Sequence, residues 1–73
     1  MVDLQLLKRV IDESGLKKEK IASEMGITRQ TLNNKLNGKF PFNNSDVMLL
    51  TQILGLTKKN VFEIFLNNKP TQG

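Results

Sequence analysis

The chain has 73 residues, of which 38% are hydrophobic, and this length allows one small domain. It contains no cysteine and no histidine, which excludes disulfide bonds, thiol or imidazole catalysis and the usual zinc sites. Eleven lysines and arginines against seven aspartates and glutamates give a net charge of +4, so an anionic partner is the first expectation.

No segment approaches the roughly 20 apolar residues that cross a bilayer, so we expect no membrane partner. The first residues do not resemble a secretion signal, because Asp3 and Gln5 interrupt the apolar patch and the basic residues follow it. The expected location is therefore cytoplasmic.

Apolar residues recur at helical spacing along the chain, and no stretch shows the alternation of a β-strand. The fold class predicted is all-α, with five short helices and short connections. The predicted helices cover about 3–14, 17–25, 28–36, 43–54 and 57–66. Residues 67–73 contain no apolar residue, and we expect a flexible C-terminal tail there.

Local signals mark the helix ends. Thr28 and Thr57 are favourable N-caps, and Asn43 with Asp46 three residues later forms the pattern of a capping box. Between the third and fourth helices, Phe40 and Phe42 predict a loop with two aromatic anchors.

Residues 17–37 hold the most informative pattern. Two helices that cross steeply need a small residue where their backbones meet, and Ala22 supplies it. A sharp turn between them favours a residue that tolerates positive φ, which is Gly26. The second helix needs an apolar anchor toward the core, and Leu32 has the right spacing. This Ala/Gly/Leu skeleton is typical of a helix-turn-helix.

The pattern resembles the helix-turn-helix of the lambda repressor and Cro-like family over about Leu4 to Leu66. The resemblance implies a five-helix, lambda-repressor-like DNA-binding domain over residues 1–66. It further implies a sequence-specific transcriptional regulator, a Cro-like repressor of a phage or prophage in a bacterial cytoplasm. Its partner would be double-stranded operator DNA, bound as a homodimer, with no cofactor.

In this family the second helix of the motif lies in the major groove with its first residues facing base edges. Arginine can fork onto guanine, and glutamine or asparagine can pair twofold with adenine. By position, the resemblance therefore implies base contacts from Thr28, Arg29, Gln30, Asn33 and Asn34.

Phosphate contacts, which position the protein without reading sequence, are expected at both ends of the motif. The candidates are Lys17, Lys18, Lys35, Asn37 and Lys39. Two of these depart from the family pattern. Lys18 stands where relatives often have glutamine, and Lys35 stands where many have an apolar residue, with Leu36 taking the apolar role one place later.

The charge distribution agrees with this interpretation. Residues 17–39 contain six basic and two acidic residues, whereas the rest of the chain contains five of each. The whole positive excess therefore lies in the predicted DNA-binding segment.

The last predicted helix is apolar over more of its circumference than one core requires. We expect Phe62 and Leu66, with Ile64 as the alternative, to form an exposed patch for a dimer or another protein. The competing expectation is that the first helix or the tail covers them.

A second hypothesis for the function follows from that patch. The domain would be a protein-interaction module, an anti-repressor or modulator that binds another phage regulator through its last helix. Catalysis is not expected, because the carboxylates lie on solvated helix faces and a chain this short builds no convincing pocket around them.

Overall fold

The computed structural model describes residues 2–66, and this range contains five α-helices and no strand. The helices are α1 (Leu4–Ser14), α2 (Lys18–Met25), α3 (Arg29–Leu36), α4 (Asn44–Leu54) and α5 (Lys58–Phe65). The prediction of an all-α fold is confirmed, and each helix begins and ends close to its predicted bounds. The predicted tail, 67–73, lies outside the described residues.

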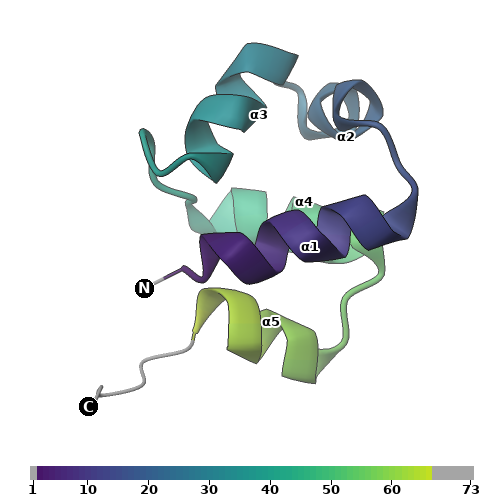
Figure 1. Cartoon of the computed structure of the whole chain (residues 1–73), viewed down its shortest axis with the longest axis vertical. Coiled ribbons are helices and arrows are strands. Elements are labelled where there is room, and N and C mark those ends of the chain that lie inside the picture. The colour runs from purple at the N-terminus through teal and green to yellow at the C-terminus, as the bar shows by residue number, and fades with distance from the viewer. Residues whose placement is uncertain (1, 67–73) are drawn as a thin grey trace.

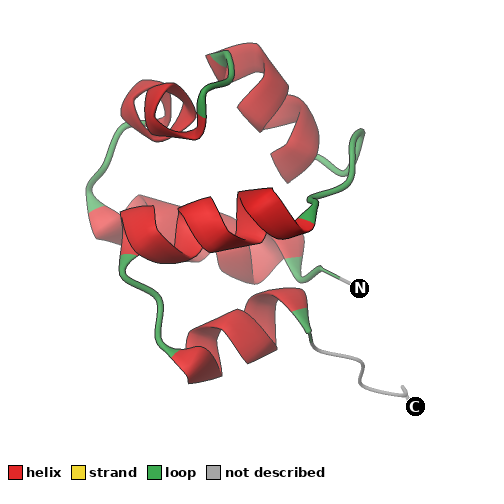
Figure 2. Ribbon diagram, turned by 180° about the vertical axis from the view of Figure 1, so that it is seen from behind, coloured by secondary structure: helices red, strands yellow, loops and turns green. Residues whose placement is uncertain are grey.

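The helices are arranged in three tiers along the long axis of the molecule. α2 and α3 lie together at one end, α5 lies at the other, and α1 and α4 run side by side between them (Figure 1). The view from behind shows the same order (Figure 2). α2 and α3 are therefore separated from α5 by the α1–α4 layer.

The predicted caps form, and they explain where the helices begin. The Thr28 hydroxyl accepts from the Thr31 N–H at 3.1 Å at the start of α3. At α4, Asn43 Oδ1 accepts from the Asp46 N–H at 2.8 Å while the Asp46 carboxylate accepts from the Asn43 N–H at 3.0 Å. Thr57 and Asn60 form the same reciprocal pair at α5.

One core joins all five helices. Its fully buried side chains come from each helix in turn: Leu7, Ile11, Ile21, Leu32, Leu36, Leu50 and Ile64. On α4, Leu50 is fully buried, while Val47, Ile53 and Leu54 pack partly against the core.

The two ends of the described chain meet at α1 and α5. The Asp3 N–H donates to the Ile64 carbonyl at 2.7 Å, just before α1 begins. The Asp3 side chain accepts from the Leu6 N–H and so caps α1 itself. The start of the first helix is thereby tied to the last turn of the fifth.

The loop between α3 and α4 differs from the expectation of two aromatic anchors. Phe42 packs edge-to-face on Phe65 of α5, with ring centroids 5.8 Å apart. Phe40 is exposed, so its prediction as an anchor is wrong.

None of the five helices within residues 2–66 has the length and the apolar composition of a membrane-spanning segment.

Candidate nucleic-acid interface

A tight turn joins α2 to α3. Gly26 has φ +75°, a left-handed conformation that residues with a side chain rarely adopt. The Ile27 N–H donates to the Ala22 carbonyl at 3.0 Å and closes the turn. The Ala22 side chain is buried, on a helix that packs against both α3 and α4. These contacts fix the direction in which α3 leaves the turn.

The buried positions of α3 determine which side chains face outward. Leu32 and Leu36 are fully buried and lie on the inner face. Helical spacing then directs Gln30 and Asn34 to the opposite face. Gln30 is exposed and Asn34 is half-buried.

The other predicted base contacts flank that outer face. Arg29 is exposed and Asn33 is half-buried. Thr28 is exposed but already engaged, because its hydroxyl caps α3 and also donates to the Thr31 hydroxyl at 2.9 Å. The polar surface thus consists of Gln30, Asn34 and the neighbouring Asn33, with Thr28 and Arg29 at the start of α3, where Arg29 lies within about 20° of the direction of Leu36.

Basic residues border this surface at both ends of α3. Lys17 and Lys18 lie at the start of α2, and Lys39 follows α3. Within residues 2–66, none of these three lysines takes part in an ion pair. Asn37 is the exposed C-cap of α3, and its N–H donates to the Asn33 carbonyl.

An acidic residue that was not predicted lies among these cations. Glu19 Oε2 is 3.7 Å from Arg29 Nη1, and both side chains are more than half exposed. Together with Lys17 and Lys18 they line a hollow of about 300 Å³ between the starts of α2 and α3. Glu19 and Arg29 are ten residues apart and belong to different helices, so no local pattern in the sequence singled out this contact.

Lys35 was predicted as a phosphate contact, and the structure corrects this. Its Nζ lies 2.5 Å from Asp46 Oδ2, and the two side chains are only 13% and 10% exposed. Position 35 lies on the side of α3 that faces the start of α4, so its ammonium group is buried in an ion pair. The sequence carried no local signal for this pair, because the two residues are eleven positions apart and belong to different helices.

The exposed face of α5 contains two of the three residues predicted for it. Phe62 and Leu66 are 58% and 57% exposed. Ile64 is 0% exposed, so the alternative that it contributes to the patch is wrong. The reason is its position two residues from Phe62, which turns it by about 200° toward the core.

An apolar groove adjoins Leu66, and it was not predicted. It has a volume of about 480 Å³ between α4 and α5, and Met48 on its wall is 65% exposed. Its lining residues are Val47, Met48, Thr51, Gln52, Leu56, Lys58, Val61 and Leu66. The groove lies on α4 and α5, whereas the polar surface lies on α2 and α3.

Comparisons with protein-family models, with curated proteins and with solved structures found no match. The interpretation of the candidate site therefore rests on its residues and their geometry alone. Within residues 2–66, no three acidic side chains are grouped so that they could hold a metal ion.

Proposed function

We propose that the protein is a sequence-specific DNA-binding regulator with a lambda-repressor-like helix-turn-helix formed by α2 and α3. The observation that carries the proposal is the outer surface of α3, whose polar side chains are able to read bases. They lie between Lys17 and Lys18 on one side and Lys39 on the other, and these lysines form no ion pair within residues 2–66. The phage or prophage assignment, with repression by blocking a promoter, follows from the family resemblance.

The proposed base readers have complementary chemistry. The Arg29 guanidinium can donate two hydrogen bonds to the major-groove edge of guanine. Gln30 and Asn34 each carry an amide that can pair twofold with adenine. Thr28 and Asn33 border them and would complete the contact.

The proposed phosphate contacts are Lys17 and Lys18 before the readers and Asn37 and Lys39 after them. Each lysine that neutralises a phosphate releases a counterion, so the logarithm of the affinity falls linearly with the logarithm of the salt concentration. Three lysines predict a slope of about −3 per protomer, because each contributes roughly −0.9.

The test measures binding of the full chain to operator DNA selected from a random pool, at several salt concentrations. We expect Arg29→Ala to cost about 1–3 kcal/mol on the selected sequence and to relax the preference at one base pair. Lys18→Ala should weaken binding to all sequences and reduce the salt slope by about 1. Lys59→Ala, which removes an exposed lysine from α5, is the control and should change neither quantity.

A second candidate function is supported by the exposed apolar face. Phe62, Leu66 and the α4–α5 groove suit a protein partner, either a second copy or another regulator. If the chain binds no DNA sequence selectively and its weak binding is unchanged by Arg29→Ala, DNA reading is excluded. The protein-interaction module then becomes the better account.

A further inference from the structure

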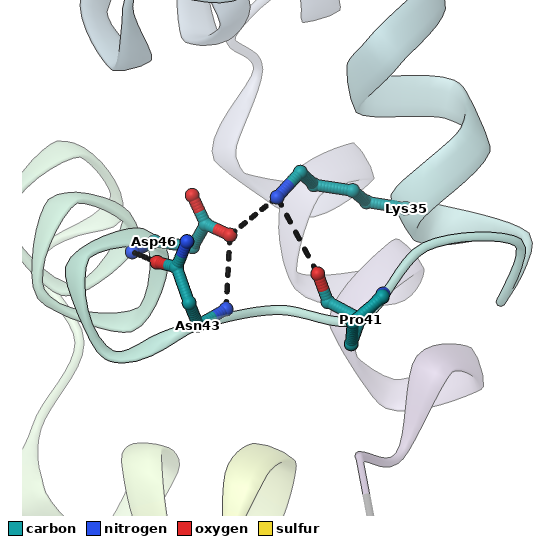
Figure 3. A network of polar contacts seen from close by, with 4 residues as sticks. All are labelled: Lys35, Pro41, Asn43 and Asp46. Atoms are coloured by element: carbon teal, nitrogen blue, oxygen red, sulfur yellow. Dashed lines mark hydrogen bonds and ion pairs between the residues drawn. The ribbon is translucent and has the colours of Figure 1, made fainter.

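A polar network joins the end of α3 to the start of α4 (Figure 3). Lys35 reaches from α3 and donates to the Asp46 carboxylate at 2.5 Å and to the Pro41 carbonyl at 3.4 Å. The same carboxylate oxygen accepts from the Asn43 N–H at 3.0 Å and so caps α4. One carboxylate therefore serves as both a helix cap and the anchor of α3.

The network continues into the core through aromatic rings. Lys35 Nζ lies 5.9 Å from the centroid of the Phe42 ring, and Phe42 packs edge-to-face on Phe65. The Lys35 side chain thereby connects α3 to the α3–α4 loop and to α4, and through the Phe42 ring to α5.

The burial of this pair decides its role. Removing two charges from water carries a large desolvation penalty, and replacing a buried pair by apolar groups is often neutral or stabilising. The pair is therefore poor at adding net stability. Its geometry is directional, however, because an ammonium group that leaves its carboxylate strands a buried charge. Leu32 and Leu36 carry no charge, so the penalty for stranding a buried charge is one that this pair adds to the packing of α3.

We infer that Lys35 and Asp46 are positioning residues, which fix the rotation and tilt of α3 against α4. The inference rests on the proposed function, because the helix so fixed is the one that presents Gln30 and Asn34 to the bases. Lys35 acts through these residues and does not contact phosphate. It thus contributes to sequence discrimination while lying away from the DNA.

The test uses the double variant Lys35→Met/Asp46→Asn in the full chain. Methionine fills the space of the lysine stem, and the asparagine oxygen can still accept from the Asn43 N–H, so the cap of α4 is retained. Lys35→Met alone leaves Asp46 buried without its partner and is expected to lower the melting temperature sharply. The matched control is Lys20→Met/Glu24→Gln, which removes an exposed ion pair from α2 and leaves the net charge equally unchanged.

We expect the double variant to melt within a few degrees of the wild type. Its ratio of specific to non-specific DNA affinity should fall at least about tenfold, the discrimination carried by one good base contact. Its salt slope should equal that of the wild type. Residual dipolar couplings of the free protein should show the α3 axis displaced or averaged relative to α4, and the control should match the wild type throughout.

Two results would overturn the inference, and a third would overturn the proposed function on which it rests. A salt slope reduced by about 1 would make Lys35 a phosphate contact. If the double variant keeps both the α3 axis and the DNA specificity of the wild type, the Lys35–Asp46 pair does not position α3 for base reading. If the wild type itself binds no DNA selectively, the proposed function fails, and the dipolar couplings of the free protein still decide whether the pair orients α3.

Discussion

Ile64 and Phe62 lie two residues apart on α5 and have opposite environments. Ile64 is 0% exposed within the core, whereas Phe62 is 58% exposed. We expect Ile64→Ala to lower the free energy of unfolding by about 2–5 kcal/mol, because it removes transfer energy and leaves a cavity. Phe62→Ala should change it by less than about 0.5 kcal/mol.

Urea denaturation of both variants measures this difference. The concentration should be low enough that the wild type is monomeric, so that association does not contribute. Equal losses of stability in the two variants would contradict the burial of Ile64 and would restore it as a candidate for the partner patch.

Residue environments were only partly predictable from the sequence. The inward direction of Leu32 followed from its spacing, and so did the exposure of Phe62 and Leu66. The burial of Lys35 did not follow, because a lysine on a helix is usually solvated and its partner lies eleven residues away. Only the three-dimensional packing of α3 on the start of α4 brings the two charges together.

The start of α4 depends on its capping box more than on its first helical residue. Asn43 Oδ1 accepts from the Asp46 N–H, an otherwise unpaired donor of the first turn. Asn43→Ala should lower the free energy of unfolding by about 0.5–2 kcal/mol. Asn44→Ala, at the exposed first position of the helix, is the matched control and should change it little.

Thermal or urea unfolding followed by circular dichroism checks this prediction. The effect of losing the cap can be distinguished from that of losing the buried ion pair. Asn43→Ala keeps the backbone N–H that donates to Asp46, so the Lys35–Asp46 contact should persist in this variant. An effect on Asn44→Ala as large as that on Asn43→Ala would show that helix propensity, not capping, controls this helix start.

The helices themselves were predictable because their signals are local. The glycines after α1, α2 and α4 and the caps at Thr28, Asn43 and Thr57 lie within a few residues of the ends they define. The α4–α5 groove was not predictable in this way. It depends on how two helices pack, and its wall includes Met48, which helical spacing alone did not assign to a surface.

At the scale of the whole molecule, the polar surface and the apolar face are on different tiers. α2 and α3 carry the candidate DNA surface, and α5 lies beyond the α1–α4 layer (Figure 1). A partner bound at Phe62 and Leu66 would therefore leave α3 accessible. The two surfaces are thus separate within one protomer.

The corresponding prediction concerns assembly. If Phe62 belongs to a dimer interface, Phe62→Asp places a charge in an apolar contact and should raise the dimer Kd by about 30-fold, the loss expected for one hot spot of about 2 kcal/mol. Sedimentation measures the assembly state, and titration with a two-half-site operator measures DNA affinity. Gln5→Asp, the same charge change on an exposed residue of α1, is the control.

Unchanged assembly and unchanged operator affinity in Phe62→Asp would exclude this patch as the dimer interface. Loss of binding to another regulator, with DNA affinity retained, would instead assign the patch to a hetero-partner.

The hydrogen bond from the Asp3 N–H to the Ile64 carbonyl has a consequence for spectroscopy and for tethering. Because it closes the chain on itself, a donor and an acceptor dye placed beside these residues would start close together and separate when the fold opens. Energy transfer between them would report any separation of the start of α1 from the last turn of α5, whether one of these elements leaves alone or the whole domain opens. α5, which carries one attachment point, lies on the far side of the α1–α4 layer from α3 (Figure 1).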